Sequence, residues 1–150
     1  MSNLEPSQIE AFLAEPSLAR LATISGNGYP HVVPVWFLWE DGAVWVSAYR
    51  STRKAKHLLA DRRCALVVDV KKAEHGVTGV LFEGEAELFE SDQPKVRSRI
   101  ERIYLKYLGP EGIQDKDPQD WLASPENMLI RLTPNILHHG DGWGTINGGD

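Results

Sequence analysis

The sequence lacks the marks of several common protein classes. Its one cysteine, Cys64, excludes an internal disulfide. No run of about 18 apolar residues is present, and the N-terminus lacks the basic and then apolar pattern of a secretory signal. We therefore expect a cytoplasmic protein that does not span a membrane. The net charge of −5 argues against general nucleic-acid binding, because affinity for phosphates needs a basic surface.

Familiar catalytic motifs are also missing. The chain has no G-x-S-x-G motif and neither of the glycine-rich motifs that bind nucleotide phosphates. Cys64 lies in the apolar run CALVVDV, which predicts a buried thiol without a base beside it in the sequence. If this protein is an enzyme, its chemistry is expected to come from a bound cofactor, and no side chain can be assigned a catalytic role from motifs.

The composition is that of one folded domain. The chain has 150 residues, of which 42% are hydrophobic and 25% charged, which is ordinary for a soluble globular protein. This length can bury a sizeable core, so residues 1–150 are expected to form a single domain with a glycine-rich tail from about residue 134.

The hydrophobic pattern predicts a mainly β protein with a few helices. Alternating or continuously apolar segments predict strands, and apolar stripes at helical spacing predict helices. Residues 109–125, with three prolines, read as a loop with at most a turn of helix near Trp121. Six strands that are mostly linked by hairpins indicate an antiparallel barrel with flanking helices. The expected strands are 18–25, 31–39, 43–48, 64–70, 79–89 and 127–133, and the expected helices are 5–15, 52–63 and 93–108.

Residues 31–59 carry the most informative pattern. Strand 31–39 is apolar on both faces, and the Asp41-Gly42 turn links it to the next strand. Pro34 interrupts the hydrogen-bonding ladder, which indicates an edge strand, a bulge or a place where another molecule approaches the backbone.

The helix that follows begins with a cluster of positive charge. Ser51 or Thr52 can cap it, and its first turn contains Arg53, Lys54 and Lys56. Cations at a helix N-terminus oppose the helix dipole, so helix stability alone does not favour them there. A bound anion would favour both these cations and the free N–H groups of the first turn. The sequence therefore predicts an anion-binding site at this helix.

Other polar clusters have simpler interpretations. Glu83, Glu85 and Glu87 share one face of a strand, which is typical of a solvated face rather than of paired catalytic carboxylates. The basic residues of helix 93–108 read as a solvated helix face. His138, His139 and Asp141 match no compact set of metal ligands, so no metal site is predicted.

Three motifs carry a resemblance to a known family. They are the strand LATI, the run G-x-P-H-x-V-P-V-W-F from Gly28 to Phe37, and the helix start S-x-R-K-x-x-x-L from Ser51 to Leu58, followed by a D-x-R turn. Residues 5–90, and more loosely the strand IRLTP, resemble the split β-barrel flavoproteins related to pyridoxamine 5'-phosphate oxidase. The branch that binds FMN or the deazaflavin coenzyme F-420 is the most similar.

This resemblance implies a six-stranded antiparallel split β-barrel with two to four helices, and it assigns a cofactor site. Arg53, Lys54 and Lys56 would hold the cofactor phosphate, with Ser47 and Ser51 as hydroxyl donors. The strand from His31 to Trp36 would lie along the cofactor ring, with the backbone of Val33, Pro34 and Val35 at the ring edge and Trp36 closing one side.

The resemblance also implies a function and a partner. It implies hydride transfer between F-420, or FMN, and a small organic substrate, in a homodimer with two sites at the subunit interface. His31 or Tyr49 could deliver a proton, although simple packing also explains both residues. Two alternatives stay open: an FMN-binding oxidoreductase of the pyridoxamine-phosphate-oxidase type, and a flavin- or haem-binding protein without catalytic activity. A barrel that binds single-stranded nucleic acid through its tryptophans fits the acidic composition less well.

Overall fold

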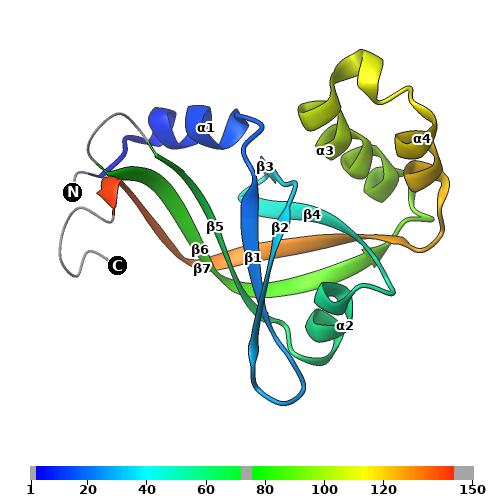
Figure 1. The fold of residues 1–150 in the computed structure, drawn as a ribbon, viewed down its shortest axis with the longest axis horizontal. Helices are drawn as coiled ribbons and strands as arrows, with labels where there is room; N and C mark the ends of the chain where they lie inside the picture. Colours follow the sequence, from blue (N-terminus) through cyan, green and yellow to red (C-terminus); the bar gives the residue numbers. More distant parts are fainter. Residues whose placement is uncertain (1–2, 72–75, 144–150) are drawn as a thin grey trace.

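The computed structural model describes residues 3–71 and 76–143, and at residues 136 and 141–143 it describes the backbone alone. In this part of the chain, seven strands form one antiparallel sheet. The strand order is β2-β1-β5-β6-β7-β4-β3, so consecutive strands mostly pair with each other. Figure 1 shows the strongly curved sheet with helices around it. The strands are β1 (Ala19–Ile24), β2 (Pro30–Val35), β3 (Leu38–Glu40), β4 (Ala43–Tyr49), β5 (Arg63–Lys71), β6 (Val77–Glu90) and β7 (Asn127–Trp143).

The described residues also form four helices, which pack around the sheet. They are α1 (Pro6–Ala14), α2 (Arg53–Ala60), α3 (Pro94–Gly112) and α4 (Lys116–Ala123). In Figure 1, α3 and α4 lie together at one end, on the opposite side from α1, and α2 lies below them. Gly109, with φ 74°, kinks α3 just before Pro110. Among the described residues, no helix is long and apolar enough to cross a membrane.

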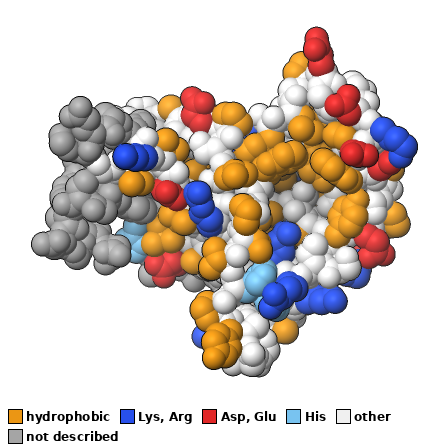
Figure 2. Space-filling view, viewed as in Figure 1, with side chains coloured by type: hydrophobic (Ala, Val, Ile, Leu, Met, Phe, Trp, Pro, Cys, Tyr) orange, Lys and Arg blue, Asp and Glu red, His pale blue; other side chains and the backbone are white. Residues whose placement is uncertain are grey.

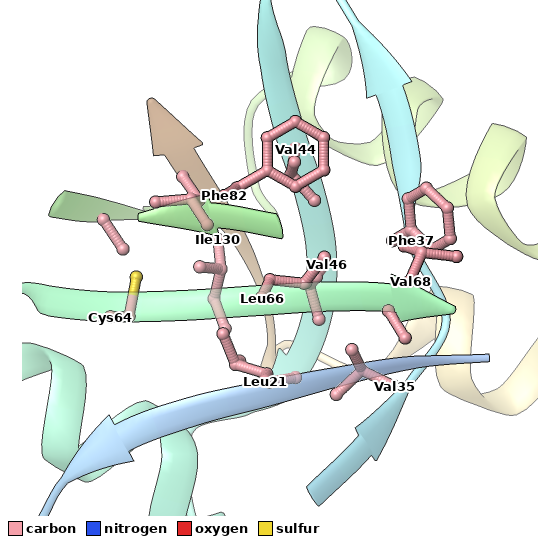
Figure 3. Close-up of a cluster of buried hydrophobic side chains, with 14 of the residues drawn as sticks. Leu21, Val35, Phe37, Val44, Val46, Cys64, Leu66, Val68, Phe82 and Ile130 are labelled. Carbon is pink, nitrogen blue, oxygen red and sulfur yellow. The ribbon is translucent and has the colours of Figure 1, made fainter. Parts of the chain in front are cut away.

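Two groups of buried side chains hold these elements together. The larger group lies inside the curved sheet and includes Leu21, Phe37, Leu66 and Phe82, each at most 1% exposed (Figure 3). Cys64 belongs to it, and its side chain is buried as predicted. The smaller group packs α3 against β4 and β7 through residues such as Ile100, Ile103 and Leu129.

The long pairing of β6 with β7 contains an irregularity at Gly84. The register shifts between Glu83 and Gly84, opposite Pro134. A Cβ atom at Gly84 would overlap the backbone carbonyl oxygen of Thr133, so only glycine lets the strands approach this closely. The bulge allows both strands to continue past a proline while they curve.

The predicted class, mainly β with two to four helices, is confirmed, and three local predictions are wrong. The predicted strand 31–39 is two strands, β2 and β3, separated at Trp36 and Phe37, which raises the number of strands from six to seven. The segment 109–125, predicted to be mostly loop, contains α4. Residues 134–143, expected to belong to a glycine-rich tail, pair with β6 as part of β7, because a long partner strand satisfies their backbone groups.

Candidate functional site

A pocket of about 360 Å³ opens beside the N-terminus of α2. Figure 2 shows a hollow on this face that is bordered by hydrophobic side chains, with Lys, Arg and His side chains gathered below it over α2. Segments distant in the sequence meet here: the β2–β3 link, the end of β4, the start of α2, and residues of α3, α4 and β7. The lining residues are Trp36, Ser47, Ala48, Tyr49, Ser51, Thr52, Lys54, Tyr104, Trp121 and Asn127.

The start of α2 is held by Thr52, one of the two predicted capping residues. Its Oγ1 accepts a hydrogen bond from the backbone N–H of Ala55 at 3.4 Å and donates one to the carbonyl oxygen of Tyr49 at 2.7 Å. Ala55 and Leu58 point into the core, which directs the other face of the helix outward. Thr52 therefore connects the helix to the end of β4. Among the described residues, no hydrogen bond is found for the side chain of Ser51, which lines the pocket.

The first turn of α2 has positive charge without a matching negative charge. Among the described residues, no hydrogen bond or ion pair is found for the side chains of Arg53, Lys54 and Lys56. Burial lowers the pKa of Lys54. Arg53 and Lys56 are exposed, and Lys54 is half-buried at the pocket wall.

His31 on β2 belongs to the same positive region. Its ring lies edge-on to that of His57, with centroids 5.0 Å apart, and its Nδ1 is buried without a partner among the described residues. Burial lowers the pKa of His31, and the charges of Arg53, His57 and Lys54 lower it further. The neighbouring charges lower the pKa of His31 because a protonated imidazole would add one more positive charge to this cluster. A bound anion would oppose this part of the shift.

Aromatic rings form the other wall of the pocket. Trp36 stacks on Tyr107 with ring centroids 5.0 Å apart and an angle of 5° between the ring planes. Tyr104 and Trp121 each meet Trp36 edge-on, at 6.1 and 6.4 Å. A pocket with apolar aromatic sides and charge at one end is typical of a site for a flat, conjugated anion.

Two side chains of α3 explain why the predicted strand breaks at Trp36 and Phe37. The Tyr107 hydroxyl accepts a hydrogen bond from the N–H of Phe37 at 3.1 Å and donates one to the carbonyl oxygen of Ser17 at 2.7 Å. Lys106 Nζ donates to the carbonyl oxygens of Phe37 and Leu13 at 3.0 and 2.8 Å. The backbone of Phe37 is thus bonded to α3 instead of to a neighbouring strand, and this turns Trp36 into the pocket.

A buried polar group forms the floor. The Nδ2 of Asn127 donates to the hydroxyl of Tyr104 at 2.8 Å and to the carbonyl oxygen of Trp121 at 3.0 Å. The Ser47 hydroxyl lies 3.4 Å from the same Tyr104 oxygen. Asn127 is 1% exposed, and its Oδ1 has no hydrogen-bond partner among the described residues.

The structure brings part of the predicted site together. Trp36, Ser47, Ser51 and Lys54 line one pocket, as does Tyr49. His31 and Arg53 lie beside it in the positive cluster. The remaining predicted residues do not line the pocket in this chain: Val33 and Val35 pack against the core, and Pro34 and Lys56 are exposed.

Sequence reasoning missed the residues that come from the C-terminal half. The sequence pattern places Tyr104 in helix 93–108, Trp121 in a loop with at most a turn of helix, and Asn127 at the start of a strand. It places Lys106 on the solvated face of helix 93–108. None of them lies in a motif, and only the folded chain places them beside residues 31–54.

The position of β2 explains both of its prolines. In the described part of the chain, β2 is the terminal strand of the sheet and pairs only with β1, with Pro34 opposite Arg20 and Pro30 opposite Ile24. Prolines cannot donate to a ladder, so they fit positions whose backbone points away from the partner strand. The edge-strand interpretation of Pro34 is confirmed. By this alternation, Val32 and Pro34 present their carbonyl oxygens outward, whereas Val33 and Val35 face β1.

Comparisons with known proteins agree with this architecture. Residues 6–135 match the family model described as pyridoxamine 5'-phosphate oxidase. No curated protein sequence matches the chain.

Solved structures with the same fold differ in what their names say they do. A conserved hypothetical protein from Mycobacterium tuberculosis is 22% identical, with a TM-score of 0.77 over 93% of this chain and 86% of its own. The haem storage protein from Vibrio cholerae is 22% identical, with a TM-score of 0.75 over 94% and 98% of the two chains. An F-420 reductase is 18% identical, with a TM-score of 0.68 over 86% and 94%. These matches confirm the split β-barrel fold.

Proposed function

Because this chain belongs to the pyridoxamine 5'-phosphate oxidase family, we propose that it binds F-420 or FMN and transfers hydride between that cofactor and a small organic substrate. This proposal rests on one observation, that a cation cluster and an aromatic pocket lie next to each other. The start of α2 has a cluster of cations that are unpaired among the described residues, and one of them, Lys54, lines a pocket walled by Trp36, Tyr104 and Trp121. One end suits a phosphate and the other a flat conjugated ring.

The residues fit a phosphorylated cofactor. The backbone N–H groups at the start of α2 and the side chains of Arg53 and Lys54 would hold the phosphate, with the Ser51 hydroxyl as a further donor. Ser47 and Trp36 would contact the ring. When bound, such a cofactor supplies the hydride chemistry.

The protein itself would position the reactants. The aromatic wall would shield one side of the ring from water, and Trp36 is held in place for this by its stack on Tyr107. Tyr49 lines the pocket and is one candidate to deliver a proton to a substrate. His31 is the other candidate, and an anion beside it would raise its pKa toward the range in which it can donate.

Between the two cofactors, we favour F-420. Lys56 is exposed on α2 and does not line the pocket, so it would contact a part of the anion that extends beyond the phosphate. F-420 has an extended acidic tail beyond its phosphate, and the R-K-x-K start of the helix suits that longer anion. The alternative is FMN, in an oxidoreductase of the pyridoxamine-phosphate-oxidase type.

We also propose that two copies of this chain form a homodimer with sites at their interface. The outer face of β2 is apolar and uncovered: Val32 is 60% exposed, and Pro30 and Pro34 beside it are exposed. Tyr29, 72% exposed, adds to this surface. A second copy would cover it, close to the cation cluster that includes His31. The measured molar mass in solution tests this point, and a monomer at micromolar concentration contradicts it.

The titration that tests the cofactor uses tryptophan fluorescence. Two of the five tryptophans, Trp36 and Trp121, line the pocket, so a bound ring should quench the signal. We expect F-420 to bind more tightly than FMN. If only FMN binds, the FMN alternative replaces our choice, and if haem binds while neither flavin does, the protein is a haem binder without this activity.

The phosphate site is tested by the double variant Arg53→Ala/Lys54→Ala. We expect cofactor binding to weaken at least tenfold, because each lost charge-assisted contact contributes about 1.5–3 kcal/mol when it is shielded from water. The matched control is Lys95→Ala/Arg97→Ala, which removes the same charge from exposed positions at the start of α3. Equal affinities of the two double variants would contradict the assignment.

A further inference from the structure

Asn127 is a buried polar side chain with one hydrogen-bonding atom left over. The residue is 1% exposed at the start of β7 and lines the pocket beside α2. Its Oδ1 has no partner among the described residues. A buried carbonyl oxygen without a partner costs free energy, and such atoms are rare in folded proteins.

The orientation of this amide is determined by its surroundings. One partner of Nδ2 is the carbonyl oxygen of Trp121, which can only accept a hydrogen bond. Rotating the amide by 180° would place two oxygen atoms against each other. The nitrogen therefore faces α4 and Tyr104, and Oδ1 is the atom that stays free.

Neighbouring hydroxyl groups add the opposite hydrogen-bonding capacity. The Tyr104 oxygen accepts from Asn127 Nδ2, and Ser47 Oγ is 3.4 Å away. Burial raises the pKa of Tyr104, so its hydroxyl keeps its proton and can donate. Asn127 Oδ1, which is itself buried, is thus an acceptor close to hydroxyl donors, and it belongs to a residue that lines the pocket.

We propose that Asn127 is a specificity residue of this pocket, whose Oδ1 accepts a hydrogen bond from the ring N–H of a planar lactam, a flat ring in which N–H lies next to a carbonyl group. The hydroxyl of Tyr104 or Ser47 pairs with the adjacent carbonyl. Two sources offer this edge: the flavin or deazaflavin ring itself, in which N3–H lies between two carbonyl groups, and a lactam substrate beside the cofactor. The first source rests on the function proposed above, whereas the second does not.

The test compares ligands that differ only at this N–H. The cofactor-free protein is titrated with FMN and 5-deaza-FMN and with their N3-methyl derivatives, and separately with 2-quinolone and N-methyl-2-quinolone. We expect methylation to weaken binding of one probe pair by roughly tenfold, because the methyl group removes the donor and leaves Oδ1 unpaired.

Two variants assign the effect to Asn127. In Asn127→Ala the acceptor is gone and room is made, so the two members of the sensitive pair should bind within about twofold of each other. In the matched control Asn135→Ala, which truncates an exposed asparagine of the same strand outside the pocket, the preference for the N–H form should persist. The comparison within wild-type protein needs no variant to fold.

Each result has one meaning. Discrimination within the flavin pairs alone places the cofactor ring on Asn127, and discrimination within the quinolone pair alone places a second ligand there; both support the proposal. Quinolone discrimination without flavin binding keeps this inference while the proposed function fails. Equal binding within every pair, no binding of any probe, or discrimination that survives Asn127→Ala overturns it.

Discussion

Removing the hydroxyl of Tyr107 should destabilise the protein through a part of the chain far from α3 in sequence. In the folded state this hydroxyl accepts from the N–H of Phe37 and donates to the carbonyl oxygen of Ser17. Tyr107→Phe keeps the ring that stacks on Trp36 and removes only the two hydrogen bonds. The substitution therefore isolates the bonds that replace sheet pairing at the β2–β3 link.

The expected loss follows from burial. Phe37 is 0% exposed, so its N–H would remain without a partner, at a cost of about 1–3 kcal/mol, and the bond to Ser17 contributes about 0.5–1.5 kcal/mol. We expect the free energy of unfolding to fall by about 2–3 kcal/mol. For a chain of this size that corresponds to a drop in Tm of roughly 5–10 °C.

Urea unfolding followed by tryptophan fluorescence measures this change. Tyr29→Phe is the matched control, because Tyr29 is 72% exposed and its hydroxyl has no partner among the described residues; its effect should stay within about 0.5 kcal/mol. Equal stabilities of the two variants would refute the role of Tyr107 in closing the link.

The buried hydroxyl of Tyr107 should also make the stability of the protein depend on pH. Burial raises the pKa of Tyr107 to about 12, above the value of about 10 in an unfolded chain. The folded state then keeps its proton to higher pH than the unfolded state, so this contribution is fully present below about pH 10 and is lost between pH 10 and 12. The difference in stability between wild type and Tyr107→Phe should shrink across that range and be constant below it.

Three further predictions concern other parts of the structure. Burial lowers the pKa of Lys106 to about 8, so the unfolded form binds the proton more strongly than the folded form. The stability of wild type relative to Lys106→Met should therefore rise between pH 8 and 10.5, and a flat difference in urea titrations contradicts this. Burial raises the pKa of Cys64 to about 12, so a thiol reagent at pH 8 should modify the folded protein far more slowly than the urea-unfolded protein; equal rates would show an accessible thiol. Gly84→Ala should destabilise the protein by about 2 kcal/mol or more, because the added Cβ meets the carbonyl oxygen of Thr133. Gly26→Ala is the control and should be nearly neutral, because nothing lies within 4 Å of a Cβ at Gly26. Equal Tm values of the two variants would argue against this crowding.

The elements that the sequence predicted well are those with strong local signals. Strands 18–25, 43–48 and 64–70 lie within two residues of β1, β4 and β5. The Asp41-Gly42 turn is present, with φ of 55° and 69° at the two residues. Hydrophobic periodicity and turn chemistry act between near neighbours, so they can be read without knowledge of the fold.

The predictions that failed depended on distant partners. Alternation alone extends one strand through residues 31–39, and only the side chains of Lys106 and Tyr107 on α3 show why it breaks at Phe37. The segment 134–143 has glycine and no strong β pattern, yet it pairs with β6. A strand can be held by the backbone groups of its partner, and that contribution leaves little trace in local composition.

By itself, the sequence determined the class of fold and the charged end of the candidate site. Thr52, Arg53 and Lys54 are consecutive, and a capped helix start places cations beside free N–H groups wherever that helix lies. The tertiary structure alone decided what faces this charge: Trp36 turned inward by α3, Trp121 from α4, and Asn127 from the start of β7 with an unpaired oxygen. The reason is physical, because the charged end is made by covalent neighbours, whereas the pocket also needs contacts between residues far apart in the sequence, such as Ser47 and Tyr104, which are 57 positions apart. Such contacts form only when the hydrophobic core closes.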